Sequence, residues 1–265
     1  MTNFVDKTVV ITGAASGMGR AYADAFAKRG ARLALIDVDT LGLEETVAVL
    51  GPEAAERVMT MTGDVADAET MAAFAERSRD ELGDAHVLVN NAGVAPSGRP
   101  AGEVTLASFQ RVMNINFYGV VHGVQAFMPQ LARQPWAAIV NISSIFGLVG
   151  APRHAEYCAA KFAVRGYTET LLSDLADSAI QVHLVHPGGV DPRIARDEHM
   201  QAFAKRYLST PPADIARHVI RAIEKNKPRV VCGHDSFKTA VGARLLPLGL
   251  MSRLIRRDMQ GLFSD

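Results

Sequence analysis

Residues 8–19 read TVVITGAASGMG and lead into a helical pattern that begins at Arg20. The β-branched, nearly continuous apolar start predicts a strand that is buried on both faces of a sheet. Gly13, Gly17 and Gly19 then form the turn into the helix, in the spacing G-x-x-x-G-x-G. A turn without side chains lets backbone N–H groups approach a pyrophosphate at the positive end of the helix. The stretch therefore predicts a dinucleotide-binding strand, turn and helix, with an ordinary glycine-rich turn as the alternative.

The same pairing of a short apolar run with a longer helical pattern recurs along the chain. The predicted strands cover Thr8–Thr12, Arg32–Asp37, Val58–Thr62, Val87–Asn90, Ala138–Ser143, Gln181–His186 and Arg229–Cys232. The predicted helices cover Gly19–Arg29, Thr40–Leu50, Ala68–Leu82, Leu106–Gln134, Cys158–Ala176 and Pro212–Lys225. Apolar strands that alternate with helices are typical of parallel sheets. The sequence predicts an α/β fold, a single-domain Rossmann-type, doubly wound parallel sheet of about seven strands.

No Pro/Gly/Ser-rich linker and no fixed-period repeat divides the chain, so residues 1–265 are interpreted as one dinucleotide-binding and catalytic domain. Two segments are expected to be irregular, residues 188–212 and the C-terminal extension 234–265. Ligands bind at loops outside the carboxyl ends of parallel strands. Residues 188–212 are therefore predicted to form a substrate lid.

Charge and cysteine content exclude several classes of protein. The chain carries 28 Lys and Arg residues against 28 Asp and Glu, so no overall field attracts nucleic acid and no such partner is expected. Two cysteines cannot form a disulfide framework, and the N-terminus lacks a signal-peptide pattern, so a cytoplasmic protein is expected. The apolar run from Leu245 to Met251 falls far short of the about 20 residues that span a bilayer. No transmembrane helix and no metal site is expected.

The end of the second predicted strand bears on the choice of cofactor. Asp37 lies 18 residues beyond Gly19, where a carboxylate can accept hydrogen bonds from the adenosine ribose and would repel a 2′-phosphate. Neither residues 14–16 nor Val38 supplies a basic group for such a phosphate. These observations favour NAD(H) over NADP(H). The alternative is that Asp37 caps the next helix or is solvated, although Asp39 is the better capping candidate.

Polar residues follow the third and fourth predicted strands at the same edge of the sheet. Asp64-Val65 follows the third strand, and Asn90-Asn91-Ala92-Gly93 follows the fourth. Asp64 can accept a hydrogen bond from the adenine amino group. Taken singly, each group fits ordinary turn chemistry equally well, because Asp and Asn favour local backbone hydrogen bonds. Their joint position favours contact with the cofactor.

Tyr157 and Lys161 form the clearest chemical pattern, because residues four apart share one face of a helix. A free phenol has a pKa of about 10, so a tyrosine that acts near neutral pH needs a cation to stabilise the phenolate. Lys161 supplies one, although this spacing alone is common and more often means a surface contact. Ser143 and Ser144 precede the pair at a strand end, and the alternation of side chains along a strand makes Ser143 the structural one.

Together these motifs resemble the short-chain dehydrogenase/reductase family. The matching residues are Thr12-Gly13-x-x-x-Gly17-x-Gly19, Asn90-Asn91-Ala92-Gly93, Asn116 in Asn-Phe-Tyr-Gly, Ser144, Tyr157-x-x-x-Lys161 and Pro187-Gly188. The resemblance implies an oxidoreductase that moves a hydride between a nicotinamide cofactor, here NAD, and a secondary alcohol or ketone. It also implies a homo-oligomer, since the family is commonly tetrameric or dimeric.

The resemblance assigns roles to individual residues. Tyr157 is the general acid/base, and Lys161 lowers its pKa and binds the nicotinamide ribose. Ser144 donates to the substrate oxygen, and Asn116 holds the water that links Lys161 to solvent. Further cofactor contacts are expected from Gly13, Ser16, Gly17, Met18, Gly19, Asp37, Asp64, Val65, Asn91, Ala92, Gly93, Pro187, Gly188 and Val190.

The chain departs from the family pattern after Pro187-Gly188. Four residues beyond the glycine, where the family often has a threonine that bonds the nicotinamide carboxamide, this chain has Pro192. Proline offers neither a hydroxyl nor an N–H, so this contact is expected from the backbone near Val190 or from a different register of the loop. Cys158 stands where small residues are usual and is interpreted as buried and inert.

Apolar residues near the predicted site favour a lipophilic substrate, although core or subunit packing explains them equally well. They are Ile145, Phe146, Leu148 and Val149 after Ser144, and Ile194, Met200, Phe203 and Tyr207 in the predicted lid.

The C-terminal extension combines leucines with a basic cluster at Arg253, Arg256 and Arg257. Such a stretch packs on another subunit or lies on an anionic membrane surface, and packing is the preferred interpretation. Its proline and glycines argue against one long helix.

Three functions compete for this chain. The leading one is an NAD(H)-dependent oxidoreductase that acts on secondary alcohols or ketones. An NADPH-linked 3-oxoacyl thioester reductase is the second, and Asp37 weighs against it. The third is a dinucleotide-sensing module without turnover. The complete set of Asn116, Ser144, Tyr157 and Lys161 weighs against a sensor, which needs no proton relay.

Overall fold

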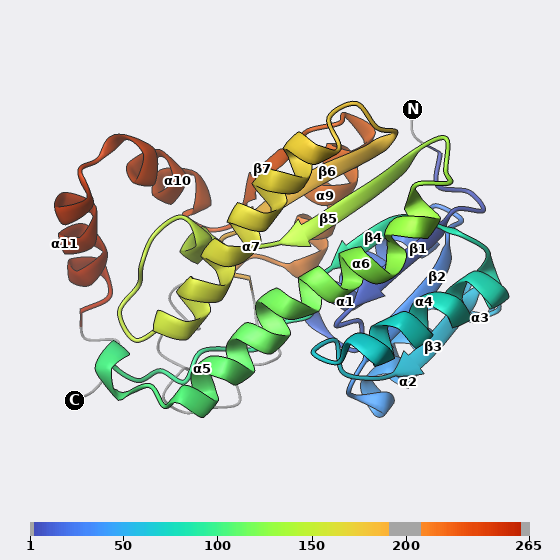
Figure 1. Cartoon of the computed structure of the whole chain (residues 1–265), viewed down its shortest axis with the longest axis horizontal. Coiled ribbons are helices and arrows are strands. Elements are labelled where there is room, and N and C mark those ends of the chain that lie inside the picture. Colours follow the sequence, from blue (N-terminus) through green and yellow to red (C-terminus); the bar gives the residue numbers. More distant parts are fainter. Residues whose placement is uncertain (1–2, 191–207, 261–265) are drawn as a thin grey trace.

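Seven parallel strands form one sheet in the order β3-β2-β1-β4-β5-β6-β7, with helices on both faces (Figure 1). The computed structural model describes residues 3–190 and 208–260. The strands are β1 (Thr8–Thr12), β2 (Arg32–Asp37), β3 (Val58–Thr62), β4 (Ala85–Asn90), β5 (Ala137–Ile142), β6 (Ile180–Pro187) and β7 (Arg229–Cys232). Strand order reverses between β1 and β4, which creates a topological switch point at the carboxyl edge. The predicted doubly wound fold is confirmed.

The helices alternate with the strands as the sequence predicts. They are α1 (Gly17–Ala27), α2 (Thr40–Leu50), α3 (Pro52–Ala55), α4 (Ala68–Leu82), α5 (Leu106–Met113), α6 (Gly119–Leu131), α7 (Ala155–Asp174), α9 (Pro212–Glu224), α10 (Ser236–Leu245) and α11 (Leu248–Asp258). Short 3₁₀ turns occupy η1 (Ala101–Glu103) and η3 (Ile145–Gly147). Asp39 begins α2 by accepting a hydrogen bond from the Gly42 N–H at 3.0 Å, so its predicted capping role is confirmed.

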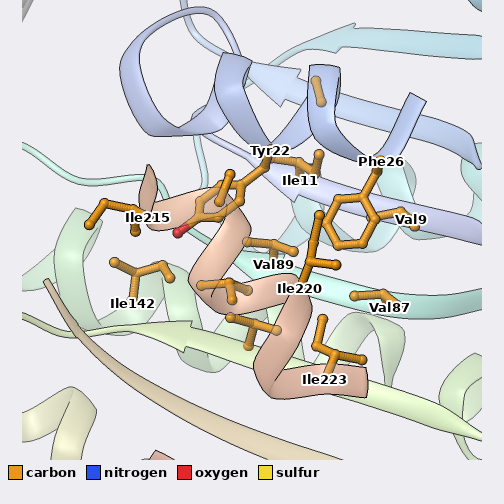
Figure 2. Packing of buried hydrophobic residues seen from close by; sticks show 14 of the residues in the cluster. Val9, Ile11, Tyr22, Phe26, Val87, Val89, Ile142, Ile215, Ile220 and Ile223 are labelled. Carbon is orange, nitrogen blue, oxygen red and sulfur yellow. The ribbon is translucent and has the colours of Figure 1, made fainter. Parts of the chain in front are cut away.

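Two hydrophobic layers hold the helices onto the sheet. Val9 and Ile11 of β1 point into one layer and Val10 into the other, as strand alternation requires. Figure 2 shows the first layer, where Tyr22 and Phe26 of α1 meet the isoleucines of α9 above the strands. Each such fully buried side chain contributes about 1.5–3 kcal/mol. This packing fixes the N-terminus of α1 at the sheet edge, beside the glycine turn.

The helix predicted over Leu106–Gln134 is confirmed for residues 106–131, but it is not regular. The structure has α5, a π-helical turn η2 (Asn114–Tyr118) and then α6. A π turn inserts one extra residue into the hydrogen-bond ladder and changes the direction of the side chains near it. Apolar periodicity does not reveal it, because the flanking helices continue the same pattern.

The C-terminal extension is also not irregular as predicted. Residues 236–258 form α10 and α11, which Pro247 separates in an extended conformation. Because proline lacks an N–H and its ring clashes with the preceding turn, it starts a new helix rather than continuing the old one. The expectation that no single long helix forms is thereby confirmed.

Most of the predicted lid, including Pro192 and the apolar residues expected there, lies outside the described residues. Within residues 3–190 and 208–260, every helix is too short or too polar to traverse a bilayer.

Candidate active site

The glycine turn is shaped by close backbone contacts. Gly13 and Gly17 have φ of 65° and 51°, in the left-handed region that favours glycine. A Cβ on Gly19 would lie 1.9 Å from the Gly13 carbonyl oxygen, so no larger residue fits. Ser16, which caps α1, makes no side-chain capping bond. The first N–H groups of α1 are thus available to an anion, such as a phosphate.

Polar groups join β1 to β4 at the switch point. The Thr12 hydroxyl accepts hydrogen bonds from the N–H groups of Asn91 and Ala92, both at 3.0 Å. The Asn91 side-chain amide donates to the carbonyl oxygens of Thr12 and Gly13 at 2.9 and 3.1 Å. The structure therefore places Asn91 as the residue that holds the turn in position. Thr12 and Asn91 fix the floor of the site through protein–protein hydrogen bonds.

Asp37 lies against the glycine turn. Its carboxylate accepts from the Ala15 N–H at 2.9 Å and from the Asp39 N–H at 3.1 Å. Asp64 instead forms a local turn, because its side chain is exposed and accepts from the Ala66 N–H at 2.9 Å. Val65 is buried beside α6, where its carbonyl oxygen meets the His122 ring. Asp37 is thus built into the turn, and Asp64 is engaged in its own loop.

Sequence reasoning did not single out Arg20, which lies in the first turn of α1, directly after Gly19. Its guanidinium donates to the Ala15 carbonyl oxygen at 2.6 Å and to Thr46 and Glu45, each at 2.9 Å. These bonds tie α1 to α2. Arg20 therefore serves the packing of the two helices, and its charge is paired with Glu45.

Ser144 lies where β5 ends and η3 begins. Its hydroxyl oxygen accepts from the Phe146 N–H at 3.1 Å, which leaves its own proton free to be donated. Ser143 points the other way, as strand alternation predicts, and donates to the Lys161 carbonyl oxygen at 2.9 Å. Ser143 thus fixes the helix turn that carries Lys161, and Ser144 faces the site.

Tyr157 and Lys161 lie one turn apart on α7, as predicted. Nζ of Lys161 is 5.7 Å from the Tyr157 ring centroid and donates to the Ile142 carbonyl oxygen at 2.9 Å. Burial raises the pKa of Tyr157 to about 12, although a hydrogen bond with Ser144 partly offsets this. Burial lowers the pKa of Lys161 to about 8. Burial therefore sets the direction of the Tyr157 pKa in this structure, and the lowering of that pKa by Lys161 stays a prediction.

Asn116 reaches this cluster through the π turn. It is fully buried, and its side chain accepts from the Val94 N–H at 2.7 Å and donates to the Val94 carbonyl oxygen at 3.0 Å. A Cβ on Gly93 would lie 3.3 Å from Oδ1 of Asn116 and 3.7 Å from Nζ of Lys161. Little space therefore remains at Gly93 beside the side chains of Asn116 and Lys161, which explains why a residue without a side chain stands there.

The segment that follows β6 is held by backbone contacts with the segment that follows β7. The Gly188 N–H donates to the Cys232 carbonyl oxygen at 2.7 Å, and a Cβ on Gly188 would lie 2.1 Å from the His234 carbonyl oxygen. Val190 pairs with Thr210. Nearby Cys158 is buried, and burial raises the pKa of its thiol, as expected of an inert cysteine.

His186 is a second residue that sequence reasoning missed. It is fully buried at the end of β6, and its Nδ1 lies 2.9 Å from the Ser144 carbonyl oxygen. Burial lowers the pKa of His186 to about 4, so the ring is neutral and Nδ1–H is the donor. The only signal in the sequence is its position directly before Pro187-Gly188. His186 holds the backbone of Ser144 in place.

The comparisons with known proteins agree with this geometry. The family model for short chain dehydrogenase matches residues 7–202. SadH of Mycobacterium tuberculosis, named as an oxidoreductase, is 38% identical over 258 residues, which cover 93% of each chain. Cis-4-hydroxycyclohexanecarboxylate dehydrogenase of Sinomonas cyclohexanicum is 36% identical over 188 residues, 71% of this chain and 75% of its own. Levodione reductase of Leifsonia aquatica is 32% identical over 227 residues, 79% and 85% of the two chains.

A solved structure matches the whole chain. A short-chain dehydrogenase/reductase from Burkholderia phymatum, crystallised with NAD, aligns with a TM-score of 0.82 and 30% identity over 100% of this chain and 99% of its own. The fold, the site and these matches define a class of protein, the oxidoreductases that bind a nicotinamide dinucleotide. This chain belongs to the short-chain dehydrogenase/reductase family.

Proposed function

We propose that the protein is an NAD(H)-dependent oxidoreductase that interconverts a secondary alcohol and a ketone. The observation that carries the proposal is the convergence of Ser144, Tyr157 and Lys161 at the carboxyl edge of the sheet, beside the glycine turn. Two relatives support the substrate class by their names, one a reductase of levodione and the other a dehydrogenase of a ring alcohol.

The side chains divide the chemistry between them. Tyr157 is protonated at neutral pH, since its pKa is about 12, and it gives this proton to the carbonyl oxygen during reduction. Ser144 donates a hydrogen bond to the same oxygen and fixes its position. A bound nicotinamide dinucleotide supplies or accepts the hydride at the substrate carbon.

The reverse reaction needs Tyr157 as a base. The phenolate then requires a cation, and Lys161 on the next helix turn is the group that stabilises it. Since burial lowers the pKa of Lys161 to about 8, the side chain stays mostly charged at neutral pH and can also release a proton. Asn116 holds the water through which that proton reaches solvent. Oxidation is therefore expected to accelerate as the pH rises.

The glycine turn fits the pyrophosphate of a dinucleotide. Gly19 approaches the Gly13 carbonyl so closely that the turn has no room for side chains, and the α1 N-terminus has no side-chain cap. Further contacts are proposed from Ser16 and Met18 in the turn and from residues that follow the strands, which are Asp64, Val65, Asn91, Ala92, Gly93, Pro187, Gly188 and Val190.

NAD(H) is proposed over NADP(H) on charge. The Asp37 carboxylate lies against the turn, where it would repel a 2′-phosphate. Arg20 is the cation that directly follows the glycine turn in the sequence. It is paired with Glu45 and donates to the Ala15 carbonyl oxygen. The site therefore favours a ribose with free hydroxyls.

A lipophilic substrate is proposed from the rings beside Tyr157. The Phe146 ring lies edge-on to Tyr157 at 6.5 Å between centroids, and the His154 ring lies edge-on to Phe146 at 5.0 Å between centroids. Burial lowers the pKa of His154, so this ring is neutral near pH 7. Neutral aromatic rings favour an apolar group next to the reacting carbon.

Tyr157→Phe tests the proposal, with Tyr167→Phe on the same helix as the matched control. Turnover of cyclic secondary alcohols with NAD is measured beside calorimetric titration with NADH and NADPH. We expect Tyr157→Phe to lose turnover by about 10²–10⁴-fold and to bind NADH normally, while Tyr167→Phe keeps both. Unchanged turnover in Tyr157→Phe would remove Tyr157 from the mechanism. Tighter binding of NADPH than of NADH would favour the thioester reductase instead.

A further inference from the structure

The two C-terminal helices expose an unusual number of large apolar side chains. We call α10 and α11, residues 236–258, the C-terminal arm. It lies beside the end of the sheet, apart from the layered helices (Figure 1). In the described part of the chain, six of the thirteen exposed large hydrophobic side chains belong to this arm. They are Phe237, Val241, Leu245, Leu248, Leu250 and Leu254.

The exposed side chains of α10 share one face. Phe237, Val241 and Leu245 follow one another at intervals of four and are 75%, 39% and 72% exposed. Lys238 and Arg244 border this stripe on either side. The result is an apolar stripe between two cations.

The exposed face of α11 has the same composition. Leu250 and Leu254 lie four apart, and Arg253 and Arg257 run next to them at the same spacing. Within the arm, Met251 of α11 lies against Gly242 of α10, and Met259, just beyond the arm, is buried.

The arm is strongly basic, whereas the chain as a whole is neutral. Residues 236–258 contain one lysine and four arginines against a single acid, Asp258, while the full chain has 28 cations and 28 anions. Lys238 pairs with Asp235 at 3.2 Å. Within the described residues, no ion pair engages Arg244, Arg253, Arg256 or Arg257. The remainder of the chain carries the compensating negative charge.

This charge weighs against a second copy as the occupant. A two-fold interface that pairs one arm with the other would bring the arginines of the two arms close together. An anionic lipid surface complements the cations and also accepts the apolar side chains between them. We propose that the C-terminal arm binds a membrane surface rich in anionic lipids and lies in the interface without crossing the bilayer.

The position of the arm suggests how membrane binding could serve catalysis. This step rests on the proposed function. α10 packs against η3, the turn that begins directly after Ser144. An arm held at the lipid surface therefore brings η3, and with it the neighbourhood of Ser144, close to the bilayer. A lipophilic alcohol or ketone can then enter from the lipid, where it is concentrated.

Sedimentation with vesicles tests the proposal on the full chain. Phosphatidylcholine vesicles with and without phosphatidylserine are compared at low and high salt. We expect binding to the phosphatidylserine vesicles only, and a loss of binding at high salt. The combined variant Arg253→Gln, Arg256→Gln, Arg257→Gln should bind about tenfold more weakly or worse. Phe237→Ser with Leu245→Ser should also lose binding, because the apolar stripe is removed.

Leu106→Ser is the matched control, since Leu106 is 72% exposed on α5 and lies outside the arm. It should bind vesicles as the unaltered protein does, and circular dichroism checks that every variant is folded. Equal binding by the arginine variant, or no binding to anionic vesicles, would overturn the proposal. A change of molecular mass in solution caused by the arm variants, without vesicle binding, would overturn it in favour of a subunit contact. Because sedimentation needs no turnover, its failure is distinct from failure of the proposed function.

Discussion

The two halves of the candidate site use their polar groups differently. In the nucleotide half, Thr12 and Asp37 already accept hydrogen bonds from backbone N–H groups of the chain. In the catalytic half, Tyr157 is partly buried and Lys161 is buried, and their pKa values are moved to about 12 and about 8. The first half is therefore a preformed backbone surface, and the second half is a set of groups held in unfavourable surroundings. Substitutions that change the shape of the backbone should therefore have their main effect in the nucleotide half. Substitutions that change charge should have their main effect in the catalytic half.

Loss of the cation should give the largest effect. Lys161→Met keeps most of the side chain but removes the charged Nζ, which lies 5.7 Å from the Tyr157 ring centroid and is proposed to stabilise the phenolate. We expect kcat for alcohol oxidation to fall about 10²–10⁴-fold, or about 3–5 kcal/mol. Steady-state kinetics measure this, with NADH titration to show that the nucleotide half is intact. A loss below about tenfold would mean that Tyr157 does not depend on this charge.

A change of shape in the nucleotide half should rank second. Gly19→Ala places a Cβ 1.9 Å from the Gly13 carbonyl oxygen, so the turn must open. We expect the free energy of unfolding to fall by about 3 kcal/mol, together with weaker NADH binding. Gly166→Ala on α7 is the control, because its Cβ meets no atom within 4 Å. Chemical denaturation should show that Gly166→Ala is as stable as the unaltered protein or slightly more stable. A similar loss of unfolding free energy in both variants would refute the steric argument.

His186 extends the comparison to stability, because it too is buried and holds Ser144. Burial lowers its folded pKa to about 4 from 6.5, with Arg229 and Arg165 adding to the shift and Glu169 opposing it. Between about pH 4 and pH 6.5, His186 therefore binds a proton in the unfolded chain but not in the folded chain. Stability is therefore full above pH 6.5 and falls as the pH drops toward 4.

His186→Asn should weaken that dependence, since asparagine can donate to the Ser144 carbonyl oxygen but does not titrate. We expect the loss of stability from about pH 7 to about pH 5 to be about 2 kcal/mol smaller in the variant. Urea denaturation at both pH values measures the difference, and the pH-independent cost of a smaller side chain cancels. Some acid sensitivity remains, because His183 is also buried with a lowered pKa. An unchanged pH slope would show that His186 is not the titrating group.

The sequence predicted the sheet well because buried parallel strands and glycine turns leave local patterns. Thr8–Thr12 and Arg32–Asp37 were predicted to the residue. The π turn at Asn114–Tyr118 was missed, because the apolar pattern continues through it and the contact of Asn116 with Val94 joins distant parts of the chain. No local pattern encodes a contact between residues so far apart in the chain.

The candidate site divides in the same way. Residue types and spacing predicted that Tyr157 and Lys161 share a helix face, but they did not predict the direction of the Tyr157 pKa. That direction depends on burial, which the whole fold determines. His186 was missed for the same reason, because only the pairing of β5 with β6 brings it to Ser144.

The choice of cofactor should show the smallest effect, since one carboxylate carries it. Asp37→Asn keeps the shape but removes the charge and one of the two acceptor oxygens that hold Ala15 and Asp39. We expect NADH to bind about fivefold more weakly, or about 1 kcal/mol, and NADPH to bind more tightly than before. Asp39→Asn removes the same charge two residues away, where asparagine caps α2 as well as aspartate does. Calorimetric titration of both variants with NADH and NADPH then distinguishes a direct contact of Asp37 with the cofactor from the effect of removing one negative charge anywhere near the site. If Asp39→Asn shifts the two affinities as much as Asp37→Asn does, the preference arises from the overall field rather than from Asp37, and shape alone governs the nucleotide half.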